Sequence, residues 1–161
     1  MTAPDVPGSG AQVGSTPKLQ VIGWHERAAL PLLGIDSAFA KLDTGADTSS
    51  LHARDIVVSA DGREVEFTAP LLRSQSDCQS WPGGGVRRVR APLVEERIVR
   101  SASGEEVRRV IETELVLGGQ RFTAQFSLTN REGLRFFMLI GRDALAGRFA
   151  IDSGQAHLLS P

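Results

Sequence analysis

The sequence predicts an all-β domain, on the evidence of strand-like alternation, the scarcity of helical periodicity and two hairpin signals. Apolar and polar residues alternate in many short segments, which is typical of half-buried strands, whereas a helical period is nearly absent. The Asp-Gly step at residues 61–62 interrupts the alternation across residues 55–67 and indicates a tight hairpin. Two longer segments within residues 86–117 predict a second hairpin. Such a succession of strands is expected to fold as a single β lobe.

The remaining elements can be placed in order along the chain. Residues 1–17 are rich in Gly, Pro, Ser, Thr and Ala and are expected to be a disordered leader, which leaves residues 18–161 as the folded domain. The irregular residues 72–85 are expected to form an exposed insertion. Further strands are expected at 19–24, 30–33, 38–42, 122–128 and 138–141, one short helix at 143–147, and a final hairpin from 148–151 and 157–160.

The composition is that of an ordinary globular domain. A length of 161 residues is enough to bury one core without disulfides, and Cys78 is the only cysteine. The net charge of −1 does not indicate nucleic-acid binding. No apolar segment reaches the length of a membrane helix, and no signal-peptide pattern begins the chain. We therefore expect a cytoplasmic protein that binds neither nucleic acid nor membrane.

The most informative segment is residues 41–50, Lys-Leu-Asp-Thr-Gly-Ala-Asp-Thr-Ser-Ser. The strand expected at 38–42 leads into it, and Gly45 permits the sharp turn that follows. Asp43 is thereby presented at a strand end with little bulk around it. This suits an acid that must approach a second carboxylate and a substrate backbone. The tripeptide Asp-Thr-Gly is also an ordinary turn sequence, so a solvated turn aspartate is the alternative interpretation.

A second segment favours the catalytic interpretation. Residues 138–145, Met-Leu-Ile-Gly-Arg-Asp-Ala-Leu, read as an apolar strand that ends at Gly-Arg and enters a short helix. With the Asp-Thr-Gly-Ala-Asp segment and the long hairpin between them, this order resembles the retropepsins, the single-lobed aspartic proteases, over residues 35–150. The resemblance implies a closed β-barrel or sandwich with a flap hairpin and one short C-terminal helix. The tip of the flap corresponds to Ser101, Ala102, Ser103 and Gly104.

Within the retropepsins, the chain is most similar to a bacterial group of RimB-like proteins. Residues 41–53 match the group's Lys-[Ile/Leu]-Asp-Thr-Gly-Ala-x-Thr-Ser-Ser-Leu-His-Ala block. Its Leu-Gly-Gly and Leu-Thr-Asn-Arg blocks are matched at 117–119 and 128–131. The group is linked with a ligase that adds glutamates to a ribosomal protein tail. The resemblance therefore implies a peptide or protein substrate and favours polyglutamylated tails.

Arginines on and before the long hairpin allow two interpretations. They either line a cleft that receives acidic peptide, or they lie on solvated faces balanced by nearby glutamates. The arginines are Arg87, Arg88, Arg90, Arg97, Arg100, Arg108 and Arg109.

Peptide hydrolysis by this chemistry needs a second carboxylate. One carboxylate acts as a base toward water and a protonated one acts as an acid toward the carbonyl, and two carboxyls about 3 Å apart share one proton. A twofold homodimer would bring Asp43 of each protomer to one place. Asp152-Ser153-Gly154 has the same pattern, but with few residues after it we expect a turn and not a second active-site half.

The resemblance also assigns roles to the neighbours of the catalytic aspartate. Thr44 is expected to hydrogen-bond across the dimer axis, and Gly45 to expose its backbone to the substrate. Ala46 keeps the wall of the cleft small, and Asp47 is expected to contact the substrate main chain. Arg142 is expected to pair with Asp47, because a planar guanidinium can fix a carboxylate beside the cleft.

The name "ATP-dependent zinc protease", often given to this group, can be tested on the sequence. His25, His52 and His157 are widely separated and lack the His-Glu-x-x-His pattern. The glycines at 83–85 are not followed by Gly-Lys-[Ser/Thr]. We therefore expect no metal and no cofactor. A non-catalytic dimeric peptide-binding module of the same fold and a metal-dependent hydrolase stay open as alternatives to the aspartic peptidase.

Overall fold

The structure is a computed structural model that describes residues 17–70 and 85–159. The expected leader and the expected insertion lie outside the described residues, apart from positions 17 and 85. Cys78 lies outside them as well. Of Ser101 only the backbone is described.

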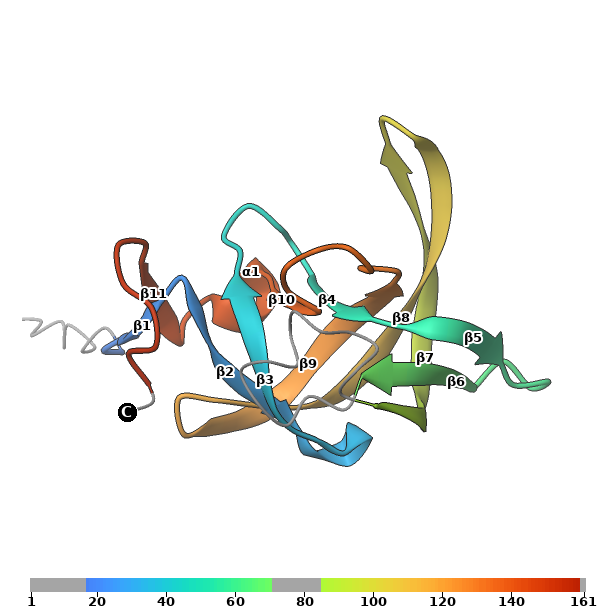
Figure 1. Ribbon diagram of the computed structural model, residues 1–161, viewed down its shortest axis with the longest axis horizontal. Coiled ribbons are helices and arrows are strands. Elements are labelled where there is room, and N and C mark those ends of the chain that lie inside the picture. Colours follow the sequence, from blue (N-terminus) through green and yellow to red (C-terminus); the bar gives the residue numbers. More distant parts are fainter. Residues whose placement is uncertain (1–16, 71–84, 160–161) are drawn as a thin grey trace, which may run out of the picture.

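The described chain is built almost entirely from β-strands, as predicted (Figure 1). The strands are β1 (Gln20–Gly23), β2 (His25–Leu30), β3 (Ile35–Leu42), β4 (Ser49–His52), β5 (Arg54–Val58), β6 (Glu64–Pro70), β7 (Val86–Ser101), β8 (Gly104–Leu117), β9 (Gln120–Thr129), β10 (Met138–Ile140) and β11 (Phe149–Asp152). The helical elements are the 3₁₀ turn η1 (Pro31–Leu33) and the short helix α1 (Arg142–Leu145). Neither of these, in the part of the chain that the structure describes, is long and apolar enough to cross a bilayer.

Six strands close into a ring. Their order is β2-β3-β10-β4-β9-β8, and a further pairing of β2 with β8, Ala28 opposite Leu117 and Ala29 opposite Val116, joins the two ends. We call this ring the barrel. β7, β6 and β5 extend from β8 as an open flank. Ring closure pairs both edges of each barrel strand, which protects this part of the sheet from edge-to-edge association.

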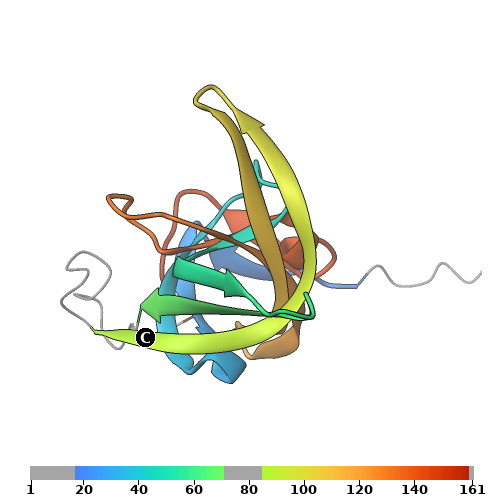
Figure 2. The ribbon, with the colours of Figure 1, turned by 90° about the vertical axis from the view of Figure 1, so that its right-hand side faces the viewer.

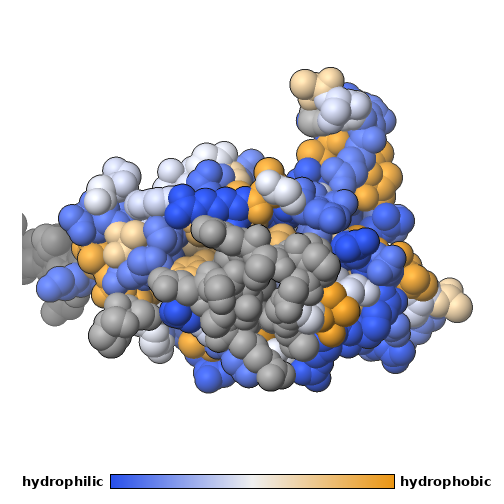
Figure 3. Space-filling model, in the orientation of Figure 1, coloured by the Kyte–Doolittle hydropathy of each residue, from blue (hydrophilic) through white to orange (hydrophobic). Residues whose placement is uncertain are grey.

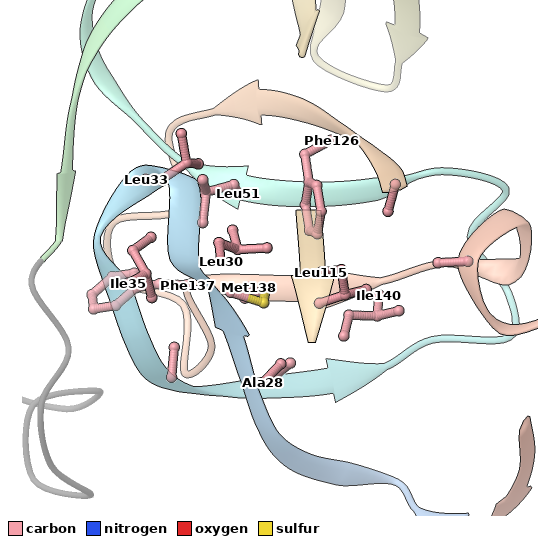
Figure 4. Packing of buried hydrophobic residues seen from close by; sticks show 14 of the residues in the cluster. Ala28, Leu30, Leu33, Ile35, Leu51, Leu115, Phe126, Phe137, Met138 and Ile140 are labelled. Atoms are coloured by element: carbon pink, nitrogen blue, oxygen red, sulfur yellow. The ribbon is translucent and has the colours of Figure 1, made fainter. Parts of the chain in front are cut away.

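The hydrophobic core fills the interior of the barrel (Figure 4). Side chains alternate between interior and exterior along β2 and along residues 111–117 of β8, as the pleat of a strand requires. Leu30, Leu115, Phe126, Met138 and Ile140 have 0% of their surface exposed. Burial of each such side chain stabilises the fold by about 1.5–3 kcal/mol relative to exposure. The barrel is therefore the rigid base on which the loops at its ends are held.

Residues 95–110 of β7 and β8 form a two-stranded arm, whose base at Arg109 and Val110 still pairs with β9 and whose residues 97–108 project from the barrel (Figures 1 and 2). The pairing continues to Ser101 opposite Gly104, so the tip is shorter than the four residues expected. Gly104 has a φ of 123°, which an L side chain rarely adopts, and this permits the tight closing turn. Ile98 and Val107 lie opposite each other and are 63% and 46% exposed, and Figure 3 shows hydrophobic surface along the arm. The apolar side chains of the arm are therefore largely exposed and are not packed into the hydrophobic core.

The expected strand over residues 30–33 is wrong. This segment forms the 3₁₀ turn η1, because Pro31 has no N–H to donate to a strand ladder. Gly34 ends the turn in a left-handed conformation with a φ of 71°. The strand lies before the proline instead, as β2, where the sequence analysis expected none.

The expected terminal hairpin is also wrong. β11 pairs in parallel with β1, and the residues after it run back over β2. There the carboxylate of Glu26, which is 0% exposed, accepts hydrogen bonds from the backbone N–H groups of Gly23 (2.7 Å), Leu158 (2.8 Å) and Leu159 (3.2 Å). The terminal segment is held by these contacts with Glu26 and not by strand pairing, so the alternation of apolar and polar residues could not predict its position. The turn expected at Asp152-Ser153-Gly154 is present. The N–H of Gly154 donates to Asp152 Oδ1 at 2.9 Å.

Candidate active site

The loop that carries Asp43 begins where two strands end side by side. β3 and β10 run in parallel, with Leu42 opposite Ile140, so the chain leaves both strands at the same end of the barrel. The backbone N–H of Asp43 donates to the carbonyl of Ile140 at 2.8 Å. Helix α1 follows β10 at this end (Figure 1). Residues 43–48 and 141–143, almost a hundred positions apart, therefore form one local structure.

Asp43 opens a tight turn. Its carboxylate accepts a hydrogen bond from the backbone N–H of Gly45 at 2.9 Å, and its carbonyl accepts one from the N–H of Ala46 at 3.3 Å. Asp43 is half-buried, whereas Thr44 and Gly45 are exposed. The turn thus leaves Thr44 and Gly45 open to solvent beside a half-buried carboxylate.

Gly141 allows the chain after β10 to approach this loop. A Cβ atom at Gly141 would lie 2.7 Å from the carbonyl carbon of Thr48 and 2.8 Å from its oxygen, and backbone atoms cannot yield as a flexible side chain can. The N–H of Gly141 donates to Ser49 Oγ at 3.1 Å, and the N–H of Arg142 donates to the carbonyl of Ala46 at 2.8 Å. The backbone of Gly141 and Arg142 thereby packs against the loop and supports it.

The side chain of Arg142 holds two points of the loop. Its Nη1 donates to the carbonyl of Thr44 at 2.8 Å, and its Nη2 forms an ion pair with Asp47 Oδ1. The predicted contact between Asp47 and Arg142 is therefore present. The two side chains are 85% and 51% exposed, and an exposed pair contributes about 0–1 kcal/mol to stability. Its effect is to orient Asp47, which leaves one face of that carboxylate toward solvent.

The arm rises on the same side of the barrel as the Asp43 loop (Figure 1), and its lower part contacts the loop. Nη1 of Arg97 donates to Thr48 Oγ1 at 3.1 Å. Burial raises the pKa of Asp143, at the start of α1, and the positive charge of Arg97 opposes that shift. The predicted tip residues 101–104 stand at the free end of the arm, beyond this contact. Their contact with a substrate stays a prediction.

Arg131 is a cation near Asp43 that the sequence analysis did not single out. Its backbone N–H donates to Nδ1 of His52 at 2.9 Å, and its Nε donates to the carbonyl of Phe136 at 2.9 Å. Burial and the positive charge of Arg108 lower the pKa of Arg131, and the negative charge of Asp43 raises it. In the sequence, Arg131 could have been noticed as the last residue of the Leu-Thr-Asn-Arg block. The block alone does not show that Arg131 lies near the charge of Asp43.

The histidines occupy two separate places. His25 and His157 lie with ring centroids 4.3 Å apart in a cluster that includes Trp24 and Phe39. His52 is buried elsewhere, and burial lowers the pKa of both His25 and His52. Among residues 17–70 and 85–159, no group of three or more His, Cys, Asp or Glu side chains is arranged to hold a metal ion.

The closed β ring and the supported Asp-Thr-Gly loop define a retropepsin-like protein. The family described as RimB-like, retropepsin-like aspartic endopeptidase RimB, matches residues 21–160, and the chain belongs to this family. A protein of unknown function from Legionella pneumophila has a similar structure, with a TM-score of 0.67 and 27% sequence identity. The similarity covers 86% of this chain and 97% of the Legionella chain.

Relatives are also found among longer proteins. A protein from Parasynechococcus marenigrum named probable alpha-L-glutamate ligase is 37% identical over 142 residues, which is 86% of this chain and 29% of that protein. A protein of the same name from Desulfotalea psychrophila is 37% identical over 136 residues, or 83% of this chain and 28% of that protein. The chain thus spans less than a third of the length of these relatives.

Proposed function

We propose that this protein is an aspartic endopeptidase in which two copies of the chain each supply Asp43. The observation that carries the proposal is a half-buried carboxylate on an exposed turn, supported by β10 and by the guanidinium of Arg142. One carboxylate is not enough, because the reaction needs both a base and an acid. A twofold axis beside Thr44 and Gly45, which are exposed in the protomer, would bring the second Asp43 to the first.

In the proposed dimer the two Asp43 carboxyls share one proton. The ionised carboxylate removes a proton from a water molecule, and the water oxygen bonds to the carbonyl carbon of the peptide. The protonated carboxyl gives its proton to the carbonyl oxygen, which forms a neutral tetrahedral intermediate. Collapse of the intermediate breaks the C–N bond: the leaving nitrogen takes up a proton from one carboxyl, and the other carboxylate accepts a hydroxyl proton of the intermediate, which gives the carboxylic acid product and restores the shared proton of the dyad. Two carboxyls about 3 Å apart cannot both ionise, which keeps the acid and the base available together.

The residues beside the dyad would bind and align the peptide. The backbone of Gly45 lies open to a substrate, Ala46 keeps the wall of the site low, and Asp47, oriented by Arg142, would accept hydrogen bonds from the peptide main chain. Thr44 would donate across the dimer axis. The tip of the arm would cover the bound peptide. The residues of the tip are Ser101, Ala102, Ser103 and Gly104.

The substrate class we propose is a glutamate-rich polypeptide. The relatives named probable alpha-L-glutamate ligase contain a region like this chain within one longer protein. A glutamate ligase and an endopeptidase in one polypeptide would act on the same chemistry in opposite directions. This supports glutamate-containing tails as the material that is cut.

The test is hydrolysis of glutamate-rich and neutral peptides by the purified protein and by two matched variants. Asp43→Asn should lower kcat by about 10²- to 10⁴-fold, because it removes the acid–base group. Asp152→Asn, in the other Asp-[Ser/Thr]-Gly sequence, should leave kcat unchanged because Asp152 caps a turn at the end of β11. Activity that survives Asp43→Asn, or that a chelator abolishes, would contradict the proposal.

The need for two copies is tested by mixing. An excess of Asp43→Asn protein added to the wild-type protein should lower the activity further than dilution does, because mixed dimers contain only one Asp43. An unchanged activity in the mixture, with subunit exchange verified by labelled protein, would show that one chain is sufficient. Peptide binding without hydrolysis by the wild-type protein would identify a binding module.

A further inference from the structure

The face of the arm that is turned toward the Asp43 loop carries two opposed arginines. Arg97 of β7 lies directly opposite Arg108 of β8. Directly opposed side chains of an antiparallel pair share one face, and like charges in this position are destabilising. Arg97 donates to Thr48, so this face is the one toward the loop. Each guanidinium has a carboxylate two positions before it on its own strand, Glu95 beside Arg97 and Glu106 beside Arg108, so this face of the arm carries a concentrated set of charges.

A chain of contacts leads from Arg108 to the end of β9. Nε of Arg108 lies 3.1 Å from Glu106 Oε2, and Oε1 of Glu106 accepts a hydrogen bond from Thr129 Oγ1 at 3.3 Å. Thr129 is the last residue of β9, two positions before Arg131. The positive charge of Arg108 lowers the pKa of Arg131, which agrees with this proximity. The arm and the loop after β9 thus bring the guanidinium groups of Arg108 and Arg131 toward each other, and the charge of Asp43 acts on Arg131.

Arg131 is fixed in place but lacks a paired carboxylate. Its backbone is held by His52 and its Nε by the carbonyl of Phe136. Within the described ranges no carboxylate forms an ion pair with its half-buried guanidinium, and the negative charge of Asp43 raises the pKa of Arg131. A partly buried charge without a direct partner is unfavourable, and a bound anion would relieve that cost.

We propose that Arg108 and Arg131 form a subsite for a carboxylate of the peptide bound at Asp43. The inference rests on the proposed function and deepens it, because it names the side chains that select an acidic substrate. A guanidinium presents paired N–H donors that match a carboxylate, so Arg131 can receive it with its terminal nitrogens while Nε keeps its bond to Phe136. The carboxylate is that of a glutamate side chain or that of the peptide's C-terminus.

Arg109 provides a matched comparison. It follows Arg108 on β8 and therefore points to the opposite face of the arm, where its Nε lies 3.2 Å from Glu96 Oε1. Arg109 is ion-paired on the arm as Arg108 is, so the two arginines differ chiefly in the face that they occupy. Substitution of Arg109 removes one positive charge from the arm without touching the proposed subsite.

The experiment measures peptide binding by fluorescence anisotropy in the Asp43→Asn protein, in which cleavage does not interfere. The labelled probes are an oligoglutamate with an amidated C-terminus, the corresponding amidated oligoglutamine, and the oligoglutamine with a free C-terminus. Arg131→Ala and Arg108→Gln should each weaken oligoglutamate binding by about tenfold or more, since a hydrogen bond to a charged group contributes about 1.5–3 kcal/mol. Arg131→Lys should fall between, and Arg109→Ala should leave the affinity within about twofold.

The outcomes separate the subsite from the proposed catalysis. A loss confined to the oligoglutamate assigns the subsite to a side chain, and a loss confined to the free C-terminus assigns it to the terminal carboxylate. Equal losses with Arg109→Ala, or no loss with Arg131→Ala in a protein whose thermal unfolding is unchanged, would overturn the subsite. If wild-type protein cuts acidic and neutral peptides equally well, the endopeptidase stands and the subsite fails. If Arg131-dependent binding is found without hydrolysis, the subsite stands and the endopeptidase fails.

Discussion

The barrel and the arm both consist of paired β-strands, but they are stabilised in different ways. In the barrel, the interior side chains such as Phe126 and Met138 are 0% exposed. In the arm, cross-strand pairs are exposed, as with Arg100 and Glu105, whose side chains are 81% and 60% accessible. Buried apolar surface contributes far more free energy than exposed ion pairs. The stability of the protein therefore lies in the barrel, and the arm is free to carry charge for other purposes.

This difference also concerns motion. A segment with few buried contacts and solvent-exposed hydrogen bonds opens locally at a lower free energy than the core does. The arm fits this description from Val110 to its tip, because Val110, at its base, is the only described residue of the arm that is 0% exposed. The arm contacts the Asp43 loop through Arg97 and Thr48, so the region of low local stability adjoins the candidate site.

The largest expected loss of stability comes from emptying the barrel. Phe126→Ala removes a fully buried ring from β9 and should lower the free energy of unfolding by about 3–5 kcal/mol. Ile98→Ala, on the exposed face of the arm, should change it by less than about 0.5 kcal/mol. Urea unfolding measures both. Similar losses for the two variants would show that the arm has a core of its own.

A smaller loss is expected where the barrel holds the terminal segment. Glu26→Gln replaces a buried carboxylate that accepts three backbone N–H groups by an amide with one oxygen, and should cost about 1–3 kcal/mol. Glu112→Gln, on an exposed position of β8, is the matched control and should have little effect. Hydrogen exchange at Leu158 and Leu159 should rise in the first variant. Unchanged exchange there would mean that other contacts hold the segment.

The dependence of stability on pH should also arise from the barrel, through His25 in β2 and His52 in β4. Burial lowers the pKa of His25 and His52 below the ordinary value of 6.5, so below that pH the unfolded chain binds protons that the folded chain does not. The free energy of unfolding should therefore fall as the pH drops from about 7 toward 5. Thermal unfolding should show a smaller decrease in Tm for His25→Phe, which removes one of these groups. An equal decrease would assign the effect to other residues.

The smallest effect is expected within the arm. The ion pair of Arg109 with Glu96 joins side chains that are 35% and 49% exposed. A double-mutant cycle with Arg109→Ala and Glu96→Ala should give a coupling free energy below about 1 kcal/mol, and it should diminish in high salt. A larger, salt-resistant value would show that the arm depends on its surface charges.

Local patterns made the centre of the candidate site predictable. The Asp-Thr-Gly-Ala-Asp and Leu-Ile-Gly-Arg segments are each fixed by turn chemistry and by the need for glycine at a close approach, as at Gly141. The Asp47–Arg142 contact follows from joining the two segments. The strand before Pro31 and the parallel pairing of β11 with β1 were not predictable, because alternation reveals a strand but not its partner.

The sequence by itself determined that the chain is all-β and where the turn of Asp43 lies, and its resemblance to the retropepsins led to the pair of Asp47 with Arg142. These features depend on residues that are neighbours along the chain or belong to one recognisable motif. Only the tertiary structure decided that Arg108 comes near Arg131, and that Glu26 fixes the terminal segment. Such contacts join side chains from different elements, and their distances depend on ring closure and strand register, which no local pattern contains.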